Sequence, residues 1–397
     1  MAKTRPSKKS SKKKNKPANG SSSTSRRKMN EDPAVLFEQA TALLLTGQPE
    51  SALSIAEKGL EIAPTGSSNV LIGLNLVAEI YVELGDIDTA RQHFTRAVAL
   101  DPNGEIPESQ GGGAEKFLWL AQLSEDGGME SVRWYERGVA ILRSNIQSQE
   151  QSGGKGADAS SSLEDEKKKL SHALCAVVEI YMTDLSWEED AESKCEALVT
   201  EALLISPESP ECLQTLASIR ISQLRHDDAR AALSRSLDLW KDLPPESPEI
   251  PDFPTRVSLS RLLMEAQMEA EALDVLGRMI LDDDESIETL YLGGWCHYLL
   301  GNKIPKDSAK EAEVELRQST LRSSRSWLKR SLKLYDLVQY EDEKLKEHAL
   351  ELVQEIEQEL GDVGDDSEGE PEDDEWEDEV GSDDDEDSTK DQEMADS

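Results

Sequence analysis

The sequence has no segment that would place it in a membrane or mark it for secretion. It contains no run near eighteen apolar residues, so we expect no membrane span. The first 28 residues are basic and Ser-rich with no apolar core, which is not typical of a secretory signal. The four cysteines are widely spaced and form no C-x-x-C pair. We therefore expect reduced, mostly buried thiols of an intracellular protein at Cys175, Cys195, Cys212 and Cys296.

The sequence also has little that could support catalysis. Five histidines are scattered along the chain, and no H-E-x-x-H, G-x-S-x-G or Gly-rich phosphate loop occurs. Gly111–Gly113 follow no predicted strand, so we interpret them as a linker. Cys296 and His297 are the one adjacent Cys/His pair, and neighbours on a helix point to different sides. We expect no catalytic residue, no cofactor and no metal site, and thus no enzyme.

Positive charge is scarce outside the start of the chain. Asp and Glu number 82 against 43 Lys and Arg, which gives a net charge of −39. Residues 1–28 hold eleven Lys/Arg and no acid, whereas residues 362–397 hold twenty Asp/Glu and one Lys. The head contributes +11 and the tail −19, which leaves −31 for residues 29–361. Such a body repels nucleic acid and attracts basic partners, so we expect no direct binding to nucleic acid.

The composition divides the chain into three regions. Residues 1–29 form a basic head and residues 362–397 an acidic tail, and both lack the apolar residues needed for a core, so we expect disorder. Residues 30–361 show apolar residues at helical spacing and no convincing strand pattern. Gly, Pro and Ser clusters predict surface loops at 103–113, 147–162 and 244–254. A further interruption begins at Asn302, and its second half has a pattern compatible with a helix.

One stretch, AEIYVELGDIDTARQHFTRAVALDP, shows how the helices pair. Small residues recur at Ala78, Ala90 and Ala97, where two antiparallel helices can approach closely. Large Tyr81 and Phe94 fill the space beside them, Gly85-Asp86 makes the turn, and Pro102 ends the second helix. This arrangement resembles the tetratricopeptide repeat of 34 residues.

The same frame returns along the chain with varying fidelity. The matching positions are Ala40, Ala52, Gly59 and Pro64; Tyr181, Val199, Ala202 and Pro207; Ala217, Ala229, Leu233 and Ser236; and Ser260, Ala272, Leu276 and Met279. Two degenerate units surround Tyr135-Gly138 and the segment YLGGWCHYLLG. A polar helix at 341–360 could seal the open end of a stack. We predict an all-α, right-handed solenoid of about seven helical hairpins with a C-terminal capping helix.

Stacked hairpins leave a concave groove lined by the first helix of each pair, which suits an extended peptide or a helix of another protein. Acids beside aromatic residues in such a groove would favour Lys/Arg-rich segments through charge-assisted hydrogen bonds and cation–π contacts. For any single residue, a solvated acid or a core aromatic is an equally good interpretation. The repeat frame predicts the partner-binding residues Asn75, Glu79, Val82, Glu83, Trp119, Glu179, Asp184, Glu265, Tyr291 and Trp295.

The overall plan resembles a fungal family of dedicated assembly chaperones for the large-subunit ribosomal protein conventionally numbered four. The resemblance rests on the cluster Lys8–Lys16, the first-repeat segment Leu36–Pro64, the repeat Ala78–Pro102 and the tail from Asp362. It implies capture of the newly made basic protein, protection of its long basic internal loop, and escort to the nucleus. It also implies a monomer in a 1:1 complex with its client, no membrane association, and a location in cytoplasm and nucleus.

Other interpretations of the charged segments and of the solenoid stay open. The basic head could be a nuclear-localisation signal read by an import receptor, or it could fold back onto the acidic body and inhibit it. The chain could also be a scaffold subunit of a nuclear multi-protein complex, or a histone chaperone that uses the same acidic surface. The identity of the co-purifying protein would separate these alternatives.

Overall fold

The computed structural model describes residues 32–152, 157–307 and 309–361, so the predicted head (1–29) and tail (362–397) lie outside the described residues. The described chain is built from α-helices α2 to α16 and one short 3₁₀ helix, with no strand among these residues. No helix in these ranges is long and apolar enough to cross a membrane. The prediction of an all-α fold is confirmed.

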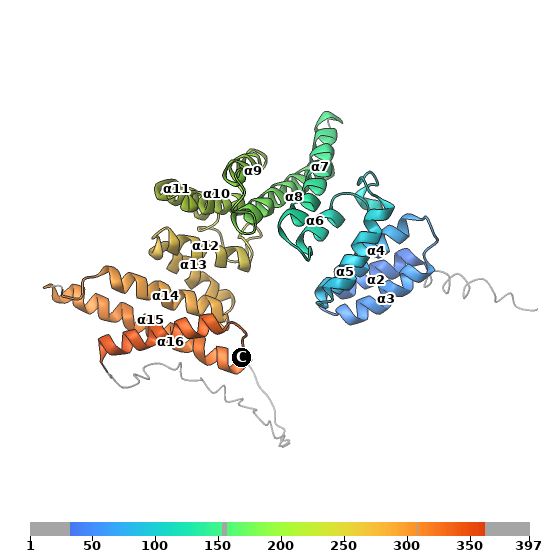
Figure 1. Ribbon diagram of the computed structural model, residues 1–397. Helices are drawn as coiled ribbons and strands as arrows, with labels where there is room; N and C mark the ends of the chain where they lie inside the picture. The colour runs from blue at the N-terminus through green and yellow to red at the C-terminus, as the bar shows by residue number, and fades with distance from the viewer. Residues whose placement is uncertain (1–31, 153–156, 308, 362–397) are drawn as a thin grey trace, which may run out of the picture.

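The helices form seven consecutive hairpins and a final single helix, as the repeat frame predicted (Figure 1). The pairs are α2 (Pro33–Leu45) with α3 (Pro49–Ile62), α4 (Ser68–Glu83) with α5 (Ile87–Leu100), α6 (Glu115–Gln122) with α7 (Gly128–Ser152), α8 (Ala157–Met182) with α9 (Ala191–Ile205), α10 (Pro210–Ser222) with α11 (His226–Asp238), α12 (Phe253–Glu265) with α13 (Glu269–Asp282), and α14 (Ile287–Lys303) with α15 (Glu311–Val338). The 3₁₀ helix η1 (Glu108–Gln110) lies between α5 and α6, and α16 (Glu343–Leu360) ends the array.

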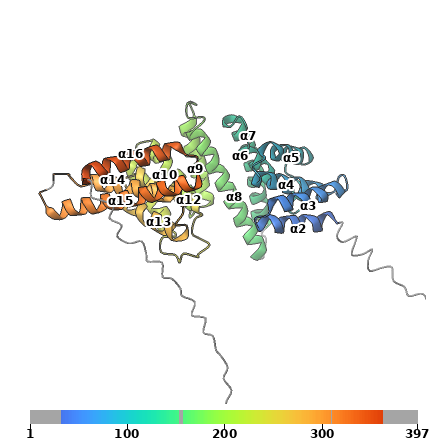
Figure 2. The same cartoon turned by 90° about the horizontal axis from the view of Figure 1, so that it is seen from below.

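The hairpins follow one another along an open arc, with α2 near one end and α16 near the other (Figure 1). First helices of neighbouring hairpins touch one another along much of the array: α2 contacts α4, α8 contacts α10, α10 contacts α12, α12 contacts α14, and α14 contacts α16. Seen from below, the long α8 lies between the N-terminal hairpins and the helices α9 to α16 (Figure 2). First helices are therefore in contact between α2 and α4 and from α8 through α16.

The turn between α4 and α5 shows how the sequence ends one helix and begins the next. Gly85 adopts a φ of +77°, a left-handed conformation that glycine reaches without strain. The amides of Gly85 and Asp86 donate to the last carbonyls of α4, which closes that helix. The Asp86 carboxylate then accepts from the amide of Thr89 at 3.1 Å and caps α5. The predicted turn at Gly85-Asp86 is confirmed.

Small residues allow the helices of a hairpin to pack closely, as predicted. Ala40, Ala52, Ala78 and Ala90 are fully buried. At Gly59 in α3 a Cβ atom would lie 2.7 Å from Cε1 of the Phe37 ring, so a side chain there would force the two helices apart. The close approach of α2 and α3 thus depends on glycine at this position.

One prediction about a connecting segment is wrong. Residues 147–162 are mostly helical, because α7 continues to Ser152 and α8 begins at Ala157. Gln, Glu and Ala are good helix formers, and contacts across the hairpin hold the extension: Asn145 Nδ2 donates to Glu166 at 3.2 Å, and Lys167 pairs with Glu150 at 3.4 Å. The predicted loops at 103–113 and 244–254 are present, and the second half of the segment after Asn302 is helical as expected.

Gly111–Gly113 lie in the connecting loop between α5 and α6, as the linker interpretation expects, and they are held against α4. Gly111 packs directly on α4, where a Cβ atom would lie 2.7 Å from the Ile72 amide nitrogen. Lys116 holds the loop in place, because its buried ammonium group lies 2.8 Å from both Asp101 Oδ2 and the Gly113 carbonyl oxygen. The other oxygen of Asp101 accepts from the amide of Glu105 at 2.9 Å. The loop is therefore a fixed wall beside α4.

Candidate functional site

A groove lies between α2, α4 and the loop that carries η1, with a volume of about 650 Å³. Its floor is apolar and includes Phe37, Ile72 and Leu76. Its polar lining includes Asn75 and the carboxylates of Glu38, Glu79, Glu108 and Glu115, and no Lys or Arg side chain lines it. We refer to this surface as the N-terminal groove.

Glu79 is the most perturbed acid of the N-terminal groove. Burial on the inner face of α4 raises its pKa from 4.5 to about 7, and the nearby Glu115 carboxylate adds to the rise. Among the described residues, no hydrogen bond or ion pair reaches the Glu79 side chain. A carboxylate that is desolvated and has no counter-charge gains from the arrival of a cation, so Glu79 marks a position suited to a positively charged group.

Asn75 lies one turn before Glu79 on α4 and faces the same groove. Its Nδ2 donates to the Gly111 carbonyl oxygen at 2.8 Å, which joins α4 to the loop wall. Its Oδ1 atom is buried and has no hydrogen-bond partner in the described part of the chain. The groove thus places an unpaired acceptor, Asn75 Oδ1, beside the unpaired Glu79 carboxylate. A bound hydrogen-bond donor would satisfy both.

Two acids of the groove, Glu108 and Glu115, form ion pairs with the same lysine. Lys169 of α8 contacts Glu108 at 2.5 Å and Glu115 at 2.7 Å. These two hydrogen-bonded acids raise the pKa of Lys169. Because Lys169 compensates part of the charge of Glu108 and Glu115, the uncompensated acids of the groove are Glu79 and the exposed Glu38.

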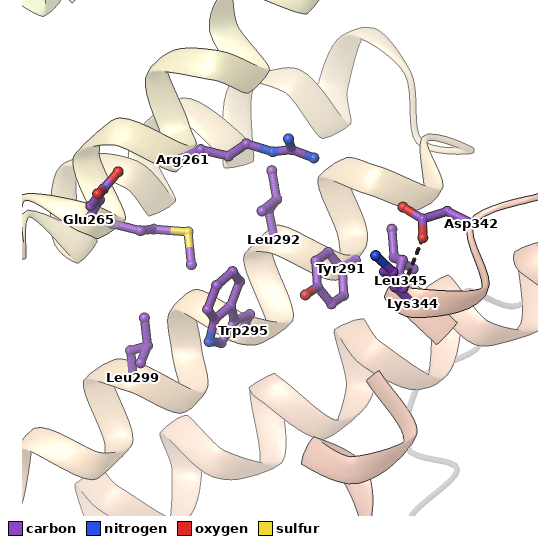
Figure 3. A pocket seen from close by; sticks show the side chains of 10 residues that line it. Arg261, Glu265, Tyr291, Leu292, Trp295, Leu299, Asp342, Lys344 and Leu345 are labelled. Carbon is purple, nitrogen blue, oxygen red and sulfur yellow. Dashed lines mark hydrogen bonds between the residues drawn. The ribbon is translucent and has the colours of Figure 1, made fainter. Parts of the chain in front are cut away.

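A second concave site lies between α12, α14 and α16, with a volume of about 570 Å³ (Figure 3). Tyr291 and Trp295 of α14 face it, together with the apolar Met264, Leu292, Leu299 and Leu345. The charges around it are mixed, since α12 contributes Arg261 and Glu265 while the start of α16 contributes Asp342 and Lys344. We refer to this site as the C-terminal pocket.

His348 of α16 holds the aromatic residues of the C-terminal pocket in place. Tyr291 Oη lies 2.7 Å from His348 Nδ1, and the Trp295 ring meets the edge of the imidazole with centroids 5.1 Å apart. Burial raises the pKa of the Tyr291 hydroxyl. Asp342 is occupied by capping α16, because it accepts from the Leu345 amide at 3.0 Å.

The structure sorts the ten predicted site residues into three groups. Asn75 and Glu79 line the N-terminal groove, whereas Glu265, Tyr291 and Trp295 line the C-terminal pocket. The remaining five line neither site: Val82, Glu83, Trp119, Glu179 and Asp184. Half of the predicted residues thus lie at two places near opposite ends of the array, and the other half lie outside both.

The five residues outside the two sites have other local environments. Val82 packs against the core around Phe94, and the Trp119 ring stacks on Phe94 with centroids 5.8 Å apart. Glu83 is exposed at the end of α4. Asp184 Oδ2 accepts from the Gly128 amide at 3.1 Å, which ties the end of α8 to the start of α7. Glu179 is exposed on α8, and partial desolvation raises its pKa.

Sequence reasoning missed three acids of the N-terminal groove, namely Glu38, Glu108 and Glu115. Glu38 follows Phe37 on the first helix of the first unit, and the helical period could have placed it. Glu108 lies in the loop, outside any repeat position, and Glu115 opens α6 at the loop's far end. No sequence signal places these two, because the loop's fold against α4 depends on the Asp101–Lys116 contact.

Among the described residues, no group of three or more His, Cys, Asp or Glu side chains is arranged to hold a metal ion. The four cysteines are buried and unbridged, which agrees with the predicted free thiols. Cys175 and Cys212 are the nearest pair, with sulfur atoms 3.6 Å apart between α8 and α10. What the two concave sites offer is non-covalent recognition of side chains.

Comparisons with known proteins agree with the helical array. The tetratricopeptide repeat family model matches residues 73–103. A protein of Emericella nidulans described as a probable assembly chaperone of rpl4 is 56% identical over 391 residues, covering 95% of this chain and 97% of that protein. A protein of Schizosaccharomyces pombe with the same description is 33% identical over 312 residues, covering 78% of this chain and 87% of that one.

A solved structure is similar as well. The assembly chaperone of RpL4 (Acl4), residues 1–338, is 51% identical and superimposes with a TM-score of 0.63. The match covers 68% of this chain and 98% of that one. The resemblance expected from the repeats and the charged ends is therefore confirmed at the level of sequence and of structure.

Proposed function

Because this chain belongs to the family of assembly chaperones of rpl4, we propose that it binds a newly made basic protein of the large ribosomal subunit along its concave face. Proteins of this family are chaperones with tetratricopeptide folds and are not enzymes. The finer part of the proposal is that the N-terminal groove takes a Lys/Arg-rich segment of the client and that the bound client stays soluble.

One observation carries the choice of surface: the N-terminal groove presents acceptors and an apolar floor but no cation. A lysine or arginine side chain fits both features, since its aliphatic stem can lie on Phe37, Ile72 and Leu76 while its charged end reaches the polar wall. The Glu79 carboxylate and the open Asn75 Oδ1 atom would accept its hydrogen bonds. Such charge-assisted bonds are about twice as strong as neutral ones.

The raised pKa of Glu79 makes binding sensitive to pH. In the free protein the carboxyl titrates near 7, and a bound cation would favour the ionised form and lower this value. Below pH 7, binding must therefore release a proton. Affinity for a basic segment should rise as the pH increases towards 7 and level off above about 8, because Glu79 is then ionised in both states.

The C-terminal pocket would supply a second contact for the same client. Tyr291, Trp295 and Leu345 offer apolar and aromatic surface, and Glu265 carries no partner among the described residues. An apolar side chain next to a basic residue would match this composition. Two separated contacts on one client strengthen binding beyond either alone, because the second forms within the complex.

The proposal extends to the life of the complex in the cell. The client would be held 1:1 by a monomer, escorted from cytoplasm to nucleus with the help of an import receptor, and released for assembly. Neither a membrane nor a nucleic acid takes part in this binding. A net charge of −31 over residues 29–361 supports the last point, since it repels polyanions.

Glu79→Lys tests the groove, and Glu83→Lys is its matched control. Both residues lie on α4 one turn apart, but only Glu79 lines the groove, while Glu83 is exposed beyond it. In titration calorimetry with the purified ribosomal protein at moderate salt, we expect Glu79→Lys to weaken binding at least about tenfold, because an inward like charge costs several kcal/mol. Glu83→Lys should stay within about threefold of the unmodified protein.

Three results would overturn the proposal. Equal effects of the two substitutions would mean that net charge, not the groove, governs binding. Preference for histones over the ribosomal protein in a direct competition would point to a different client class. Recovery from cells of a stable multi-protein assembly at high salt, without the ribosomal protein, would favour a scaffold.

A further inference from the structure

From the position and charge of the N-terminal groove we infer that the basic head, residues 1–28, occupies this groove when no client is bound. The head then acts as a tethered competitor of the client. The inference rests on the proposed function in one respect, since competition has meaning only if the client uses the same groove.

The first support is where the described chain begins. Asp32 caps α2 by accepting from the Ala34 amide at 3.1 Å, and Ala34 is itself part of the groove lining. Phe37 and Glu38 follow within the next turn and also line it. The head is therefore attached at the edge of the groove.

The second support is reach. The groove extends along α2 from Ala34 to Leu45, a separation of eleven positions that spans about 16 Å in a helix. Lys28 precedes Asp32 by four residues, or at most about 14 Å of extended chain, and Lys16 precedes it by sixteen, or about 55 Å. Cations of the head can thus reach every part of the groove without displacing α2.

The third support is complementary charge. The head holds eleven Lys/Arg and no acid, so its cations have no partner within the segment. The groove gathers Glu38, Glu79, Glu108 and Glu115 and has no cation in its lining. The C-terminal pocket is a poorer match, because Arg261 and Lys344 line it. The methylene stems of head lysines can also cover the apolar floor of the N-terminal groove.

Tethering makes even a weak contact effective. A segment joined by a short flexible linker acts at an effective concentration in the millimolar range. If the head fills the groove about 90% of the time, the apparent affinity of a client falls about tenfold. A client that makes contacts beyond the groove overcomes this barrier, whereas a short basic peptide does not, so the head would raise selectivity for the full client.

A peptide of residues 1–28 is a direct probe of this inference, used on the full-length protein. We compare the natural chain with a chain in which all eleven Lys/Arg of the head are replaced by Gln. The peptide should bind the neutralised chain about tenfold more tightly, because its groove is empty. Adding Glu79→Lys to the neutralised chain should abolish this gain, whereas adding Glu83→Lys should preserve it. A gain that persists with Glu79→Lys would come from net charge alone and would overturn the inference.

Zero-length carbodiimide cross-linking supplies a second, independent measurement. In the monomeric full-length protein, head lysines should couple to Glu38, Glu79 or Glu108, and these links should disappear when the ribosomal protein is added. Links from the head exclusively to residues 362–397, or no links at all, would overturn the inference.

The two proposals fail in distinguishable ways. If the ribosomal protein binds Glu79→Lys as tightly as the natural chain, the proposed groove is wrong whatever the head does. If client binding requires Glu79 but the head links elsewhere, the placement of the head is wrong and the proposed function stands.

Discussion

Replacing Glu79 with Gln should stabilise the free protein and weaken its function at the same time. The folded-state pKa of Glu79 is raised from 4.5 to about 7, so folding disfavours the ionised carboxylate. Each pKa unit corresponds to about 1.4 kcal/mol, which gives a cost of about 3 kcal/mol above pH 7. Gln keeps the shape and removes the charge, and no hydrogen bond to Glu79 among the described residues is lost.

The sign of the pH dependence follows from the two pKa values. The unfolded chain loses its proton near pH 4.5 and the folded chain near pH 7, so the cost appears as the pH rises between these values and is complete above 7. The gain from Glu79→Gln should be below about 1 kcal/mol at pH 5 and about 3 kcal/mol at pH 8.

Hydrogen exchange suits this measurement, because a repeat array opens locally and a single global unfolding energy is poorly defined for it. Peptides that cover α4 should exchange about 100-fold more slowly in Glu79→Gln than in the natural chain at pH 8, with a much smaller difference at pH 5. Glu83→Gln, on the exposed end of the same helix, is the control and should change exchange little. Equal exchange of Glu79→Gln and the natural chain at pH 8 would refute a desolvated, unpaired carboxylate at this position.

Two further predictions concern packing and the loop wall. Gly59→Val should destabilise the first hairpin by about 1–3 kcal/mol, since a Cβ atom would lie 2.7 Å from Phe37. Gly277→Ala in α13 is the control. A Cβ atom at Gly277 would meet no atom within 4 Å, so this change should be neutral or stabilising by up to about 1 kcal/mol. Hydrogen exchange of peptides that cover α3 and α13 compares the two, and equal losses of protection would contradict the packing. Lys116→Met should lower the local stability around α6 by about 3–5 kcal/mol because it leaves Asp101 buried without its counter-charge. Adding Asp101→Asn should restore part of the loss, measured by hydrogen exchange of peptides that cover α5 and α6. No recovery in the double variant would argue against the ion pair as the cause.

The fold could be predicted from the sequence because small residues recur at the positions where paired helices pack most closely. Ala78, Ala90 and Gly59 occupy contacts too close for larger side chains, and such contacts recur with the spacing of the hairpin. The helical extension at 147–162 could not be predicted from local composition. Gly and Ser in that stretch suggest a loop, but pairing across the hairpin, as between Lys167 and Glu150, overrides local preference.

The site could be predicted only in part. Asn75 and Glu79 follow from the inward face of a first helix, which the period of the repeat identifies. Glu108 and Glu115 do not, because their position depends on how one loop folds back onto α4. Val82 and Trp119 lie outside both concave sites, because their half-buried side chains pack against the core around Phe94. Surface position within a repeat is therefore less predictable than the repeat itself.

We propose that a Lys/Arg-rich segment of the ribosomal protein lies against the first helices of the array. Carbodiimide cross-linking of the purified 1:1 complex, read by mass spectrometry, tests it most directly. Client lysines should couple to Glu38 and Glu79 and leave Asp274, exposed on the second helix α13, unmodified. Links to Asp274 and other second-helix acids, with none at Glu38 or Glu79, would contradict it.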